Sequence, residues 1–338
     1  MNKFLSVFLS LALAVCLCGA AFAEAAVQPA VIEISTAEEL AAIADDLSGN
    51  YVLTADIDLN GAEWIPLGTF VQLGTEGEEA EMPNPDFAFS GTFDGQGHTI
   101  SNFTIHQPQG WCIGLFGCIA NADVGNFAVT GAETEGTVMV SAVVGYAFCS
   151  TVHDVTLDDA TVTAYASEMS AEGMYGGIVG AGMGSLISDC VAKADIVIPD
   201  NTANTGIVGG GLEQTSVVNC TASGTVTAGS FCYGLGGVSG CGFGAEAFTN
   251  CVAKDVVITA GEGCFWIGGV TGYAGGYEDE AWGVPVTVFT GCSVDHVSFN
   301  VAEGTETGEI VCAGFYDDAV AEAYGAPFDA PSKYVIVE

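Results

Sequence analysis

Short runs in which apolar and polar residues alternate recur along most of this chain. The runs at 195–198, 224–227 and 255–259 are rich in Val, Ile and Thr, and Gly, Asn or Asp flank them. Alternation over about four to eight residues is typical of a half-buried β-strand. No amphipathic helix of useful length fits between these runs, so the pattern predicts an all-β protein.

Two sequence marks recur at a nearly constant spacing. The first is a Gly-apolar-apolar-Gly motif or a variant of it, and its last glycines are Gly117, Gly145, Gly180, Gly209, Gly240 and Gly272. The second is a triplet that ends at Phe127, Val155, Cys190, Cys220, Cys251 and Cys292. Marks that advance in step indicate one unit stacked repeatedly. Because parallel crossover connections are right-handed by default, the predicted fold is a right-handed parallel β-helix.

Three of these repeats resemble the GLUG motif, a Gly-Leu-any-Gly core followed about ten residues later by Asn-Cys or a similar pair. They read GGIVGAGMGSLISDCVAKADI, GIVGGGLEQTSVVNCTASGTV and GGVSGCGFGAEAFTNCVAKDV. The stretches YVLTADIDLNGAEWIPLG and FSGTFDGQGHTISNFTI are similar to the segment that often precedes such repeats. The resemblance spans residues 34–299. It implies a β-helical, adhesive protein of the bacterial surface, and it implies no enzymatic activity.

The two ends of a β-helix need covers, because open rungs are adhesive edges. Ser35-Thr36-Ala37-Glu38 has the form of a capping box, and Leu40, Ile43 and Leu47 follow with helical spacing. We therefore expect a short helix at 37–47 over the N-terminal end. At the other end, we expect a helical turn at 317–324 and a last strand at 334–337.

The first 23 residues have the pattern of a secretory signal peptide, with Lys3, an apolar run at 4–18 and Ala21-Phe22-Ala23 before the cleavage point. Lipoprotein cleavage before Cys16 or Cys18 is the alternative, but Val15 and Leu17 precede those cysteines, where a small residue is expected. No later apolar run has the length of a membrane span. The expected layout is a signal peptide at 1–23 and one β-helix domain at 24–338. That domain comprises an N-terminal cap and first rungs (24–110), GLUG-like repeats (111–300) and a C-terminal cap (301–338).

Composition narrows the choice of partners. The chain has 42 acidic residues, four lysines, no arginine and a formal net charge of −38. Nucleic acids and anionic membrane surfaces would be repelled, because binding them requires clustered cations. The charge favours solubility through repulsion, and a cation-rich surface layer or a calcium site is the alternative explanation. Together with the signal peptide, the expected location is secreted or at the cell surface, with a glycan or a surface protein as the expected partner.

The cysteines after the signal form a pattern of their own. Cys190, Cys220, Cys251 and Cys292 close successive repeats, so we expect a ladder of thiols inside the helix, where free cysteine acts as a small apolar filler. A zinc site would need ligands that converge on one point, which a linear stack does not provide. Cys232 and Cys264 occupy matching positions and are the predicted disulfide pair.

Candidate chemistry is sparse, and we predict no catalytic residues. Lyases on such β-helices commonly use Arg or Lys as the base, and with no Arg and only three lysines after the signal that mechanism has little to work with. No Ser or Cys has the context of a nucleophile elbow. A glycosidase needs only two carboxylates, so a carbohydrate-active enzyme stays an alternative, as does a purely structural surface module. No cofactor is expected other than Ca²⁺, for which two acidic loops supply candidate ligands: Glu76, Glu78 and Glu79, and Glu278, Asp279 and Glu280.

Aromatic residues supply the candidate binding site. Trp111 and Trp266 each lie six residues before the last glycine of their repeat, and Tyr175 and Tyr233 fall within one residue of that position. We expect these four rings to line one edge of the helix as a platform for sugars, although aromatic residues also serve packing.

Overall fold

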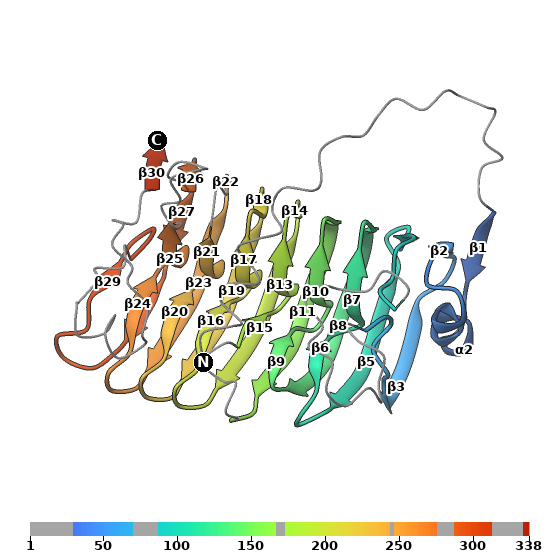
Figure 1. The fold of residues 1–338 in the computed structure, drawn as a ribbon, viewed down its shortest axis with the longest axis horizontal. Coiled ribbons are helices and arrows are strands. Elements are labelled where there is room, and N and C mark those ends of the chain that lie inside the picture. Colours follow the sequence, from blue (N-terminus) through green and yellow to red (C-terminus); the bar gives the residue numbers. More distant parts are fainter. Residues whose placement is uncertain are drawn as a thin grey trace.

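The computed structural model describes residues 30–69, 87–166, 173–243, 247–275, 287–312 and 334–337. Parallel strands wind into a β-helix, with three sheets running along its length (Figure 1). Every registered strand pair is parallel, and partners lie one repeat apart, as with Ile196 opposite Val226 and Val226 opposite Ile258. The predicted all-β parallel helix is confirmed.

Sheet A has seventeen strands, and most turns contribute two of them or one long one. Its strands are β1 (Val31–Ile34), β2 (Asn50–Leu53), β3 (Ile57–Glu63), β4 (Thr92–Asp94), β5 (Thr99–His106), β8 (Asp123–Gly136), β11 (Thr151–Ala164), β14 (Leu186–Ser188), β15 (Val191–Ile198), β18 (Ser216–Val218), β19 (Thr221–Ala228), β22 (Ala247–Thr249), β23 (Val252–Ala260), β26 (Thr287–Thr290), β27 (Ser293–Asp295), β28 (Ser298–Asn300) and β30 (Tyr334–Val337).

Sheets B and C are narrower, and most turns from β6 onward contribute one short strand to each of them. Sheet B comprises β7 (Phe116–Ala120), β10 (Val144–Phe148), β13 (Val179–Met183), β17 (Gly209–Glu213), β21 (Ser239–Phe243) and β25 (Thr271–Gly275). Sheet C comprises β6 (Trp111–Ile113), β9 (Val138–Val140), β12 (Tyr175–Gly176), β16 (Ala203–Gly206), β20 (Tyr233–Gly236), β24 (Phe265–Gly268) and β29 (Thr307–Gly308).

The alternation of the sequence becomes the inside and outside of the helix. In β15 the burial alternates strictly along the strand, and Ala192, Ala194, Ile196 and Ile198 face the core. Identical positions of neighbouring turns stack, as Phe248 and Phe289 do with ring centroids 5.0 Å apart. The strands expected at 195–198, 224–227 and 255–259 are confirmed as the second halves of β15, β19 and β23.

The glycine mark lies at the tight corner between sheets C and B. A Cβ at Gly180 would lie 2.7 Å from the Gly145 carbonyl oxygen and 2.7 Å from the Met139 carbonyl carbon, so backbone of the previous turn leaves no room for a side chain. In the repeat after it, the position belongs to Gly210, which faces the Gly180 carbonyl oxygen. Gly209, which we had placed there, pairs with Val179 instead. Two adjacent glycines made that assignment ambiguous.

The second mark lies at a bend in sheet A. Asp189, Asn219 and Asn250 have φ of 54°, 54° and 52°, a left-handed conformation that Asn and Asp tolerate better than other side chains. Their side chains join neighbouring turns, since the Asn219 amide donates to Asp189 at 2.9 Å and the Asn250 amide donates to Asn219 at 3.0 Å.

Each bend leads into the predicted cysteine ladder. Cys190, Cys220 and Cys251 are fully buried in the core and Cys292 is half-buried. Their thiols donate to backbone carbonyl oxygens, for example Cys190 to Ser188 at 3.1 Å and Cys251 to Val217 at 3.3 Å.

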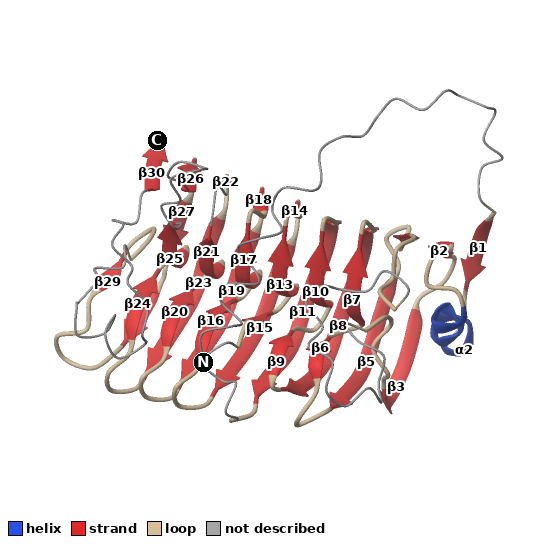
Figure 2. Cartoon of the chain, viewed as in Figure 1, coloured by secondary structure: helices blue, strands red, loops and turns tan. Residues whose placement is uncertain are grey.

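A short helix lies beside the first turn, at the N-terminal end of the stack (Figures 1 and 2). It runs as α2 (Ala37–Ala41) and continues as the 3₁₀ turn η1 (Ala42–Asp45), so the expected extent to Leu47 was too long. The cap is also one residue later than expected: Thr36 accepts from the Glu39 backbone N–H, and the Glu39 carboxylate, not Glu38, accepts from Ser35. Leu40 and Ile43 are fully buried against the first turns.

At the C-terminal end, β30 is the expected last strand, and it pairs with β26. The signal peptide at 1–23, the helical turn at 317–324 and both acidic loops lie outside the described residues.

Candidate ligand-binding face

The four expected aromatic residues do not share one edge. The Trp111 side chain is 44% exposed, whereas Tyr175 is fully buried. In the register of sheet C, Tyr175 pairs with Val140 and Thr205, which are core positions, and its hydroxyl donates to the Thr137 carbonyl oxygen. Tyr175 is therefore a packing residue of the core, and the expectation that it lines a sugar platform was wrong.

The two tryptophans are one position out of register. Trp111 pairs with Val138, and the same column continues through Ala203 and Tyr233 to Phe265, the residue before Trp266. The first repeat has one residue fewer between sheets C and B: two residues separate Ile113 from Phe116, but three separate Val140 from Val144. Counting back from the last glycine therefore aligned residues that face in different directions.

Tyr233 and Trp266 do come together, with two aromatic residues that the sequence did not single out. The Tyr233 ring stacks on Phe265 with centroids 5.3 Å apart, and Trp266 meets both edge-on at 5.8 and 4.9 Å. Tyr273 of sheet B packs against Trp266 at 4.7 Å. We call these four residues the aromatic cluster. Tyr233, Phe265 and Trp266 are partly exposed, and Tyr273 is buried beneath them.

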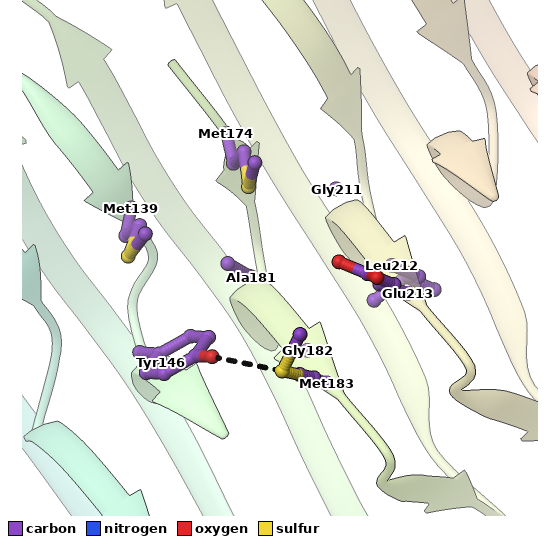
Figure 3. Close-up of a pocket in the computed structure, with 9 residues that line it drawn as sticks. All are labelled: Met139, Tyr146, Met174, Ala181, Gly182, Met183, Gly211, Leu212 and Glu213. Carbon is purple, nitrogen blue, oxygen red and sulfur yellow. Dashed lines mark hydrogen bonds between the residues drawn. The ribbon is translucent and has the colours of Figure 1, made fainter. Parts of the chain in front are cut away.

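A second feature lies farther toward the N-terminus, where β9, β10, β13 and β17 meet. A cavity of about 30 Å³ opens there, lined chiefly by Met139, Tyr146, Met174, Met183 and Glu213 (Figure 3). That volume can hold a water molecule or a small ion. The Tyr146 hydroxyl donates to the Met183 sulfur at 3.7 Å. Met139, Tyr146, Met174 and Met183 belong to an apolar cluster that is separate from the core of the helix.

The cavity holds one acidic group. Burial raises the pKa of Glu213 to about 7, because the charged carboxylate loses hydration there. Burial also raises the pKa of the nearby Cys118 thiol to about 12 and that of Cys112 well above its usual range. Both thiols therefore stay protonated at neutral pH while no cation is bound.

The four histidines that follow the signal are all engaged with carboxylates. His153 lies between Asp123 at 3.0 Å and Asp154 at 2.8 Å, and although burial lowers its pKa, those hydrogen bonds and charges raise it on balance. His98 pairs with Asp56, His106 with Glu135, and His296 with Asp255 and Asp295. The pairs with Asp56, Glu135, Asp123 and Asp255 join neighbouring turns, whereas those with Asp154 and Asp295 lie within one turn.

The predicted disulfide pair lies on neighbouring turns and is not bonded in this structure. Cys232 and Cys264 are adjacent free thiols: the Cys264 sulfur accepts from the Cys232 backbone N–H at 3.3 Å, while each thiol donates to a carbonyl oxygen at 3.1 Å. Within the described ranges, no cluster of three or more His, Cys, Asp or Glu residues has the arrangement of a metal site. The same residues include no helix long and apolar enough to cross a membrane.

Comparison with known proteins supports the fold. The chain superposes on a crystal structure from Bacteroides ovatus, described as a candidate immunoglobulin A1 protease, with a TM-score of 0.54 and 17% identity over 83% of each chain. A second solved structure, an IgA1 protease, gives a TM-score of only 0.36 over 76% of this chain and 21% of that one, which carries no argument.

In sequence, an alignment of 118 positions that covers 31% of this chain is 33% identical to a part of Halomucin from Haloquadratum walsbyi. The match spans 1% of the length of that much larger protein. No family model matches the chain, so the GLUG assignment stays a resemblance.

Proposed function

We propose that this chain is a secreted or cell-surface β-helical protein of the GLUG type, and that it binds glycans through the aromatic cluster without acting as an enzyme. The observation that carries the proposal is the partly exposed arrangement of Tyr233, Phe265 and Trp266 over Tyr273. Aromatic faces of this kind stack on the apolar faces of sugar rings, while the tyrosine hydroxyl offers a polar contact.

The location rests on the signal pattern of the first 23 residues and on the high negative charge. The non-enzymatic assignment rests on the state of the reactive groups. No Ser or Cys has the context of a nucleophile elbow beside any of the four histidines that follow the signal, and most of the eleven thiols that follow it are buried. The likeness to a structure described as a candidate protease is evidence for the fold alone, because similarity at 17% identity does not transfer a catalytic activity.

The test is glycan-array binding by the purified mature chain (residues 24–338), first with calcium and then with chelator. Stacking of one sugar ring on one aromatic face contributes ~1 kcal/mol or more, so Trp266→Ala and Tyr233→Ala should each weaken binding by about tenfold. Trp111→Ala is the matched control, because that ring is exposed but lies several strands away in sheet C.

Far-UV circular dichroism of each variant separates loss of the site from loss of the fold. Binding that is insensitive to both cluster variants, or equally sensitive to Trp111→Ala, contradicts the assigned site. No binding on the array contradicts the glycan proposal and favours a structural or protein-binding module. Loss of binding with chelator alone would move the site to the acidic loops.

A further inference from the structure

A carboxylate interrupts an otherwise apolar column of sheet B. The register of that sheet places Ala120, Phe148, Met183 and Glu213 at the same position of successive turns. Glutamate is seldom buried unless it is paired, and a residue that departs from the pattern of its repeat is expected at a functional site. Glu213 therefore needs an explanation that packing does not give.

The space beside Glu213 arises because side chains become smaller along the neighbouring column. In that column Tyr146 pairs with Ala181, and Ala181 pairs with Gly211, which has no side chain. The resulting cavity of about 30 Å³ opens to the surface and has room for roughly two water-sized groups. Figure 3 shows the Glu213 carboxylate directed toward Ala181, across this space.

The Glu213 carboxylate has no partner among the side chains that the structure describes. Burial raises its pKa to about 7, and no hydrogen-bond donor or cation opposes that rise. The Tyr146 hydroxyl at the same cavity donates to the Met183 sulfur. A buried polar group without a partner is costly, and it commonly marks the place of a water or an ion.

The chain itself does not supply a cation for this carboxylate. Of the three lysines that follow the signal, Lys193 and Lys254 belong to β15 and β23 of sheet A, and Lys333 directly precedes β30 of the same sheet. The histidines pair with other carboxylates, and there is no arginine. A cation for Glu213 therefore comes from outside the chain, and the net charge of −38 attracts it.

The lining of the cavity selects among cations. Ca²⁺ and Mg²⁺ need several oxygen ligands, and one carboxylate among thioethers does not supply them. A primary ammonium group needs less, because its N–H groups can donate to one carboxylate and to weaker acceptors. Methionine sulfur is such a weak acceptor, and the face of the Tyr146 ring attracts a cation.

We propose that Glu213, with Tyr146 and the methionines of the cavity, binds the primary ammonium group of an alkylamine or of a lysine side chain. The ammonium donates to the carboxylate inside the cavity, and its methylene stem leaves through the opening along the thioethers. Where Glu213 is protonated, it releases that proton to solvent when the ammonium binds. The site is separate from the aromatic cluster and does not rest on glycan binding.

The n-butylammonium ion is the probe, and n-butanol is its uncharged counterpart of similar shape. The mature chain carries ¹³C-labelled methionine methyl groups, and their NMR signals are followed in about 0.15 M NaCl, which screens binding to the acidic surface. The signals of Met139, Met174 and Met183, assigned from single leucine variants, should shift and saturate with butylammonium. Butanol should bind about tenfold more weakly or less, because it forms no charged hydrogen bond.

Two glutamine variants locate the charge that binds the probe. Glu213→Gln should weaken butylammonium binding about tenfold or more at pH 8. Glu303→Gln removes an exposed carboxylate instead, so it should leave the affinity unchanged. Circular dichroism of each variant confirms that it is folded.

The pH dependence gives a second readout. Affinity should fall about tenfold for each pH unit below 7, because the Glu213 carboxyl must lose its proton, and should be level near pH 8. Calorimetry in buffers of different ionisation enthalpy should show release of nearly one proton at pH 6 and almost none at pH 8. The other described titratable groups near the cavity are Cys149 and three groups whose pKa burial raises, Tyr146, Cys112 and Cys118.

Two short peptides distinguish the sources of the ammonium group. N-acetyl-Ala-Lys-Ala-amide should displace butylammonium, and the arginine counterpart should do so several-fold less well, because a planar guanidinium is larger than an ammonium group. A lysine peptide that binds more tightly than butylammonium supports the site with a protein partner. One that binds more weakly supports it with a small amine.

The alternative is that the methionines fill an irregular gap around a cavity that holds only water. That role predicts that butanol binds as well as butylammonium, or that neither shifts the methyl signals. Either result overturns the proposal, as does full affinity in folded Glu213→Gln. If Glu213→Gln fails to fold, an affinity of the wild type that is equal at pH 5 and pH 8 overturns it. Glycan binding by the aromatic cluster is independent of all these outcomes.

Discussion

Glu213 determines how the charge of the cavity between β9, β10, β13 and β17 depends on pH. Its neighbours along sheet B include Met183, and the cavity around it is lined by thioethers, Tyr146 and Leu212. Burial among these groups raises the carboxyl pKa from 4.5 to about 7. Between these two values the folded chain keeps a proton that the unfolded chain has released, so stability falls as pH rises across this interval.

We predict that Glu213→Gln makes the protein more stable than the wild type at pH 8 and leaves stability nearly unchanged at pH 4. The pKa difference corresponds to at most ~3 kcal/mol, and relaxation of the cavity will reduce it. Urea unfolding of both chains between these pH values measures the difference. Glu303→Gln, at an exposed position, is the control. A Glu213→Gln effect that is independent of pH contradicts the assignment.

At the scale of single residues, the sequence predicted the aromatic binding site only in part. It singled out Tyr233 and Trp266, which the structure brings together, but it could not separate them from Tyr175, whose ring faces the core. A period near thirty residues does not specify which way a side chain faces, because a difference of one residue between sheets reverses the orientation. The cavity gave no sequence signal beyond three methionines, and Met139 and Met183 lie far apart in the sequence.

The corner between sheets C and B is the element on which the repeat depends. Gly145, Gly180, Gly210, Gly240 and Gly272 each face backbone of the previous turn, so a substitution there cannot be accommodated by moving a side chain. We predict that Gly180→Ala destabilises the protein by roughly 2–4 kcal/mol, far beyond the ordinary effect of this substitution.

Gly182→Ala is the matched control for that prediction. It lies in the same strand, and its added Cβ would meet only side-chain atoms of Leu212 and Thr215 at 3.1 Å, which can shift. Denaturant midpoints of the two variants should therefore differ clearly. Equal effects would show that the corner tolerates a side chain and that the glycines recur for another reason.

The secondary-structure elements were the most predictable level of the structure, because the backbone imposes the same requirement at every turn. Glycine at a closed corner, Asn or Asp at a left-handed bend and Cys in the core are each demanded by backbone geometry, and stacking repeats that demand at every turn. The helix cap was predicted less well, because Ser35 and Thr36 are both good caps and Glu38 and Glu39 are both good partners. Only the three-dimensional contact of Leu40 and Ile43 with the first turns selects between them.

At the scale of the whole molecule, the dominant property is charge on a quasi-linear stack. The net charge of −38 is distributed over turns that contact mainly their immediate neighbours. The described lysines offset little of it, and Lys193 is paired with Asp158 at the exposed surface. Like charges one turn apart repel each other in water over roughly the Debye length, which falls from about 30 Å at 0.01 M salt to about 8 Å at 0.15 M.

We therefore predict that NaCl stabilises this protein: the melting temperature should rise by several degrees across that concentration range and then level off. Calorimetry at a series of salt concentrations measures it. Levelling off identifies screening, because the effect of an excluded solute grows in proportion to its concentration. A rise that needs only millimolar CaCl₂ and is absent with MgCl₂ at equal ionic strength would instead identify a calcium site. A fall in melting temperature with NaCl would show that the histidine–carboxylate pairs between turns outweigh the repulsion among the acidic residues.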